Sequence, residues 1–131
     1  MIKLRRFKME YTIDYLEDKN IIQVKVKGRV NFQIVKQYSI ETVKLARENN
    51  CRKFLINHIK TLLEDGIYKI HTDGDALEQF GFKTTDKIAI VVSRSQDELR
   101  FSEATDSNVK WSNFKYFGDA KEASRWLAAE E

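Results

Sequence analysis

Two short, continuous apolar runs constrain the fold of this chain more than any other feature. They are KFLINHI at residues 53–59 and KIAIVV at residues 87–92. A membrane span needs about 20 apolar residues, so these runs are too short to be spans. They also lack the strict alternation of a strand with one face in water, and each is typical of a strand covered on both faces. The chain therefore requires helices on both sides of its sheet.

The residues before these runs predict an antiparallel hairpin. Apolar and polar side chains alternate over residues 11–15 and again over 22–26, and a polar stretch at 17–20 separates the two segments. Gly28 is expected to end the second strand. Two antiparallel strands thus precede the buried runs.

A long helix is predicted next, from the N-cap Asn31 to about residue 50. A helical wheel places on its inward face Phe32, Val35, Tyr38, Val43 and Ala46. Ile40 projects away from that face, either as an isolated surface side chain or as part of a contact patch.

The rest of the chain alternates further strands and helices. A second helix is predicted over residues 65–80, with Gly81 placed to end it, and Gly74 able to bend it. Capping boxes at Ser95 with Glu98 and at Asp119 with Glu122 open a third and a terminal helix, which flank a strand at 113–117. The expectation is one α/β domain over residues 1–131, with a mostly parallel mixed sheet of about five strands and about four helices.

Charge and cysteine content exclude several classes of protein. The chain has 23 basic and 20 acidic residues, interleaved almost everywhere, and this pattern predicts no one-sided basic face for nucleic acid. Residues 1–8 are locally basic and are interpreted as a tail or an edge segment, and no apolar signal sequence follows them. One cysteine, Cys51, excludes an internal disulfide. A cytoplasmic protein without a membrane span is expected.

No residue pattern in the chain is typical of catalysis or of metal binding. His71 and Asp75 share a face of the predicted helix, but Asp73 points away from both. His58 has no acid or nucleophile spaced to it, and there is no glycine-rich phosphate loop. We therefore expect no metal, no cofactor and no catalytic residue; a hydrolase using His58 or His71 is a third, weaker hypothesis.

The carboxyl ends of the buried strands are the expected place for a ligand. Six residues occupy these ends: Asn57, His58, Lys60, Ser93, Arg94 and Ser95. Arg94, together with the amides that open the third helix, is able to hold an anion, or it is a solvated loop charge.

The order of elements, and the segments VKVKGRVNF, DKIAIVVS and FKYFGDAKEASRWL, resemble the STAS or SpoIIAA-like domain of anti-sigma-factor antagonists and of single-domain bacterial proteins. The likeness covers residues 9–129. Its most specific part is the spacing of Phe117, Asp119, Ala123, Trp126 and Leu127. These are packing and capping residues, so they indicate the fold more than the function.

The resemblance also locates a corner at Glu64, Asp65 and Gly66. In the antagonists a serine at the start of the second helix is phosphorylated by a partner kinase, and here Glu64 and Asp65 stand at the two serine positions. Asp65 is either a plain N-cap, worth about 1 kcal/mol, or a permanent imitation of the phosphorylated state. Thr61, expected in the same loop, is the nearest hydroxyl and is interpreted as a hydrogen-bonding loop residue rather than a phosphate acceptor.

Two functions are consistent with these features. The first is a non-enzymatic STAS-like interaction or regulatory module that meets a regulator or kinase-like protein, or a second copy of itself, through Thr61, Glu64, Asp65 and Gly66. The alternative is a small-molecule or lipid carrier with an apolar pocket, a hypothesis based on the aromatic residues Tyr38, Tyr68, Phe80, Phe82, Phe101 and Trp111.

Overall fold

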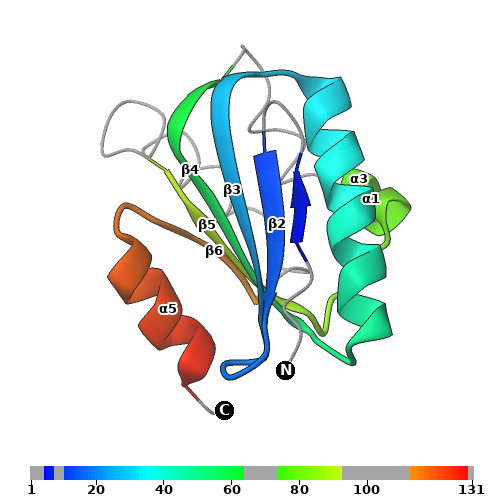
Figure 1. The fold of residues 1–131 in the computed structure, drawn as a ribbon, viewed down its shortest axis with the longest axis vertical. Helices are drawn as coiled ribbons and strands as arrows, with labels where there is room; N and C mark the ends of the chain where they lie inside the picture. Colours follow the sequence, from blue (N-terminus) through cyan, green and yellow to red (C-terminus); the bar gives the residue numbers. More distant parts are fainter. Residues whose placement is uncertain (1–4, 8–10, 64–73, 93–112, 130–131) are drawn as a thin grey trace.

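The computed structural model describes residues 5–7, 11–63, 74–92 and 113–129, which form a mixed sheet with helices on both faces (Figure 1). The six strands, which lie in the sheet in chain order, are β1 (Arg5–Phe7), β2 (Tyr11–Leu16), β3 (Ile21–Val30), β4 (Lys53–Leu63), β5 (Lys87–Val91) and β6 (Phe114–Phe117). The helices in the described part of the chain are α1 (Phe32–Glu48), α3 (Gly74–Phe80) and α5 (Ala120–Ala128).

The strand directions confirm the predicted α/β class. β1, β2 and β3 pair antiparallel, whereas β3, β4, β5 and β6 pair parallel. The predicted hairpin is β2 and β3, and the two apolar runs are β4 and β5 in the middle of the sheet. β1, within the basic residues 1–8, adds an edge strand next to β2, so the described sheet has one strand more than the expected five.

Helices α1 and α3 cover one face of the sheet and α5 covers the other (Figure 1). Two hydrophobic clusters result, because successive side chains of a strand point to opposite faces. Tyr38, Phe54 and Ile88 belong to the larger cluster beneath α1. Leu55 and Leu127 belong to the smaller cluster beneath α5. Both faces of β5 and of residues 54–56 of β4 are thus buried, as the apolar runs predicted, whereas Ile59 at the end of the first run is 42% exposed.

Helix α1 begins where the sequence predicted. The side chain of Asn31 accepts a hydrogen bond from the amide of Ile34 at 3.0 Å and so caps the helix. The buried residues of the helix include Val35, Tyr38, Val43 and Ala46, as expected, and also Leu45. The inward orientation predicted for Phe32 is wrong: its side chain is 48% exposed at the first position of the helix, where its ring lies beside that of Phe80 on α3.

Within the described ranges, Gly28 and Gly81 adopt the left-handed conformation that favours this residue. Gly81 (φ +106°) ends α3, and the amide of Phe82 donates to the carbonyl of Leu77 at 3.1 Å, as in a C-terminal cap. Gly28 (φ +83°) was expected to end β3, but the strand continues through it to Val30. That prediction is wrong because Val30 is apolar and fully buried, and its burial keeps the strand in the sheet.

The terminal helix α5 is capped at both ends by described residues. Asp119 accepts a hydrogen bond from the amide of Lys121 at 2.6 Å. The ammonium group of Lys87 donates to the carbonyls of Trp126 and Ala129, which lie at the negative end of the helix dipole. Of the residues expected to face inward, Ala123 and Leu127 are fully buried and Trp126 is partly buried against the same cluster, so these contacts fix α5 against β4 and β5.

Candidate functional site

Strand β4 contains a bulge at His58 and Ile59. Lys25 of β3 pairs with Asn57, but Lys27 pairs with Lys60, so two residues of β4 lie opposite Val26. Bulges are rare between parallel strands and are enriched next to functional sites. A bulge of this kind changes the direction in which the neighbouring side chains point.

Two side-chain hydrogen bonds hold the bulge in shape. The carboxamide oxygen of Asn57 accepts from the amide of Ile59 at 2.9 Å. The hydroxyl of Thr61 donates to the carbonyl of His58 at 2.6 Å. The side chains of Asn57 and Thr61 thus replace part of the backbone hydrogen bonding between β3 and β4 that the bulge interrupts.

The bulge also explains why β4 is longer than predicted. The sequence indicates a strand over residues 53–59 followed by a polar corner, because Lys60 and Thr61 are polar. Beyond the bulge, however, Leu62 pairs with Arg29 and Leu63 pairs with Val30. The end predicted for this strand is therefore wrong, and Thr61 is a strand residue opposite Gly28 rather than a loop residue.

His58 points to the α1 face of the sheet. Its side chain is 2% exposed, and its Nε2 lies 2.8 Å from the hydroxyl oxygen of Tyr38, with which it forms a buried hydrogen bond. Burial raises the pKa of Tyr38 well above its ordinary value of 10.0. His58 is thus a core residue with a hydrogen-bond partner.

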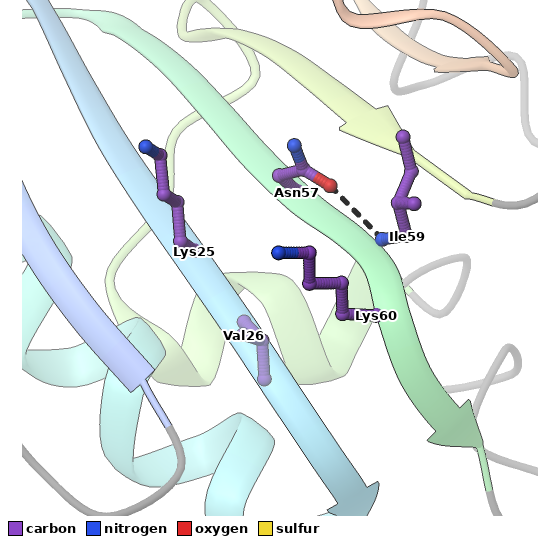
Figure 2. Close-up of a pocket in the computed structure, with 5 residues that line it drawn as sticks. All are labelled: Lys25, Val26, Asn57, Ile59 and Lys60. Atoms are coloured by element: carbon purple, nitrogen blue, oxygen red, sulfur yellow. Dashed lines mark hydrogen bonds between the residues drawn. The ribbon is translucent and has the colours of Figure 1, made fainter.

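Asn57 and Lys60 point to the opposite face, on the side of Leu55 and α5. Together with Lys25, Val26 and Ile59 they line a pocket of about 300 Å³ (Figure 2). Lys25 and Lys60 are exposed, and Ile59 is 42% exposed. Two of the predicted ligand residues, Asn57 and Lys60, are therefore brought together, whereas His58 is not among the lining residues.

Sequence reasoning missed Lys25, Val26 and Ile59 as members of this pocket. The alternation of apolar and polar residues in the hairpin does indicate the face on which Lys25 lies, opposite to that of Val24. The pairing of Lys25 with Asn57 depends on the register between two strands separated by a helix, and the sequence carries no local signal for it.

Several predicted site residues lie outside the described residues. They are Glu64, Asp65 and Gly66 at the corner, and Ser93, Arg94 and Ser95 after β5. The second helix before Gly74, including His71 and Asp73, and the third helix from Ser95 also lie outside them.

Three further observations concern the chemistry of the described residues. No group of three or more His, Cys, Asp or Glu side chains within them is arranged to hold a metal ion. Burial raises the pKa of the Cys51 thiol, which donates to the carbonyl of Asn20 at 3.2 Å. None of the described helices combines the length and the apolar character that crossing a membrane requires.

An antiparallel hairpin that leads into a parallel sheet with helices on both faces defines an α/β domain of SpoIIAA-like fold. The chain is similar to the crystal structure of an uncharacterised protein of the DUF3478 family from Shewanella loihica PV-4, which is described as having that fold. The likeness covers 96% of this chain and 92% of that chain, with a TM-score of 0.50 and 17% sequence identity. No family model and no curated protein matches the sequence.

The comparison confirms the predicted fold. At 17% identity it concerns the fold alone, and the function must be argued from the residues of this chain.

Proposed function

We propose that the protein is a non-enzymatic STAS-like interaction or regulatory module, which meets a protein partner at the corner formed by Glu64, Asp65 and Gly66. The observation that supports this proposal most is the end of β4. Leu63, the residue before Glu64, pairs with Val30, and α1 begins just after Val30. β4 therefore ends beside the residue that precedes α1, and the chain continues from there to Glu64.

An exposed aromatic side chain lies at that amino end. Phe32 is 48% exposed, and its ring centroid is 6.3 Å from that of Phe80 on α3. Aromatic side chains are enriched in protein interfaces, where they bury a large area at a low entropic cost. An exposed aromatic side chain at the end of the sheet where β4 leads into Glu64 is a suitable contact for a protein partner.

Three buried ionisable groups of the described residues, those of His58, Asp86 and Lys87, have structural roles. His58 bonds to Tyr38, and Lys87 bonds to the carboxyl end of α5. Asp86 accepts hydrogen bonds from both terminal nitrogens of Arg47, at 2.8 and 3.3 Å. None of them is among the residues that line the pocket beside β4. These contacts support binding rather than catalysis.

The carrier alternative has less support from the described residues. Tyr38, Phe80 and Phe82, three of the aromatic residues on which it was based, are buried in the core cluster beneath α1. The pocket beside β4 is lined by two lysines and is not a deep apolar cavity.

The proposal is tested by capture from an extract of the native cell on immobilised protein. The Asp65→Arg variant is expected to lose most of the retained partner with little change in melting temperature, because the substitution reverses the charge of a corner side chain. Asp18→Arg is the matched control: Asp18 is exposed in the turn between β2 and β3, at the other end of β3 from Val30.

Mass spectrometry identifies the partner as a regulator, a kinase-like protein or a second copy of this chain. Equal retention by the wild type and Asp65→Arg would overturn the proposal, and so would equal loss with both variants.

A further inference from the structure

A strip of positive charge crosses the α5 side of the sheet, beyond the part that α5 covers. It consists of the exposed side chains of Lys25, Lys27 and Arg29 on β3 and Lys60 on β4. Residues two apart on a strand share a face, and the register places Lys60 next to Lys27. Three of the four cations alternate along β3, and the register of the sheet adds the fourth, Lys60 of β4.

The strip has no compensating charge in its own strands. Neither β3 nor β4 contains an acidic residue. Lys27 and Lys60 are direct register partners, and like charges at such positions destabilise a sheet. None of the four cations forms an ion pair with another described residue. An anion bound from solution would remove this repulsion.

The pocket within the strip presents hydrogen-bond donors. Its polar side chains are those of Lys25, Asn57 and Lys60 (Figure 2). The carboxamide oxygen of Asn57 already accepts from the amide of Ile59, so its NH₂ group is the part left to donate. Two ammonium groups and an amide donor are complementary to an oxyanion.

An apolar surface lies beside these donors. Ile59 is 42% exposed because the bulge adds it to the strand without a partner of its own on β3. A volume of about 300 Å³ is at the lower end of the range for pockets that hold small molecules. The pocket therefore combines a cationic part with a small apolar part.

We propose that this pocket binds a small organic anion, with an oxyanion head between Lys25 and Lys60 and a short alkyl group against Ile59. The site differs from the corner that the proposed function uses, so either proposal can fail without the other. A phosphate monoester and a carboxylate share this chemistry. The phosphate carries more charge, so it is expected to bind more tightly to two lysines.

The test is a titration of the ¹⁵N-labelled full chain with butyl phosphate, hexanoate and inorganic phosphate, followed by NMR. Butyl phosphate is expected to bind most tightly and to shift the signals of Lys25, Asn57 and Lys60. Lys25→Gln and Lys60→Gln are each expected to weaken its binding by about fivefold, the upper range for an exposed charge pair. Ile59→Ser is expected to weaken the binding of butyl phosphate but not that of inorganic phosphate.

Lys44→Gln is the matched control, because Lys44 is an exposed lysine on α1, away from this face. It is expected to leave the affinity unchanged. Tighter binding of hexanoate than of butyl phosphate would assign the site to carboxylates and overturn the order given above. The proposal as a whole is overturned if none of the three anions binds at about 10 mM, a concentration at which even millimolar affinities are detected. Equal weakening by Lys44→Gln and Lys60→Gln would also overturn it.

Discussion

Tyr38 of α1 and His58 of β4 share a buried hydrogen bond of 2.8 Å between the phenol oxygen and Nε2. This bond ties the first helix to the bulge of the central strand. Because His58 is held on the α1 face, the residues on either side of the bulge, Asn57 and Lys60, are directed to the opposite face. The geometry of the pocket thus depends on a contact in the core.

Removal of the phenol hydroxyl is expected to destabilise the protein. Tyr38→Phe leaves a ring nitrogen of His58 without its partner in a buried place, which costs about 1–3 kcal/mol of unfolding free energy. Tyr15→Phe is a suitable control, because its hydroxyl bonds to Asn20 at a partly buried site and its loss is expected to cost less. Urea denaturation measures both. Equal costs for the two variants would contradict a special role for the buried bond.

The raised pKa of Tyr38 predicts a loss of stability in alkali. Below pH 10 the phenol is neutral in both the folded and the unfolded chain, so it has no effect on stability. Above its ordinary value of 10.0 the unfolded chain ionises while burial keeps the folded phenol neutral, and the unfolding free energy falls as the pH rises.

Urea denaturation between pH 9 and 11 measures this fall. Tyr38→Phe is expected to reduce the slope without abolishing it, because the pKa of Tyr15 is also raised. An unchanged slope in Tyr38→Phe would show that other groups cause the fall.

The two glycines with positive φ are expected to differ in their tolerance of alanine. At Gly28 an added Cβ meets no atom within 4 Å, so Gly28→Ala pays only the conformational cost of about 1–2 kcal/mol. At Gly81 the added Cβ lies 3.0 Å from Cγ1 of the packed Val43, so a steric cost is added. Thermal denaturation is expected to show a lower melting temperature for Gly81→Ala. The reverse order would contradict the packing described for Val43.

Local patterns in the sequence are sufficient for most of this fold. Alternation predicts β2 and β3, a continuous apolar run predicts β5, and Asn31 and Asp119 mark the starts of their helices because their side chains cap free amides. The exposure of Phe32 was missed because a helical wheel gives the face of a residue but not how much of its side chain the neighbouring elements cover.

The candidate site was only partly predictable. Asn57 and Lys60 follow from the rule that ligands approach the carboxyl ends of parallel strands. The bulge was not predicted, because it depends on hydrogen bonds of Asn57 and Thr61 that compete with an ordinary ladder only once β3 lies alongside. Lys25, Lys27 and Arg29 alternate in the sequence, but Lys60 joins them only through the register between β3 and β4.

In the proposed function the partner binds without a covalent switch, because Glu64 and Asp65 stand where the antagonists carry serines. Thr61, the hydroxyl nearest to the corner, already donates to the carbonyl of His58 at 2.6 Å within β4, and this contact supports a structural role. The most direct measurement is the amount of partner retained by protein purified from the native cell, before and after treatment of that protein with a phosphatase. Equal amounts of retained partner are expected before and after the phosphatase treatment. A change in retention on treatment, with a phosphoryl group mapped to Thr61 in the untreated protein, would contradict it.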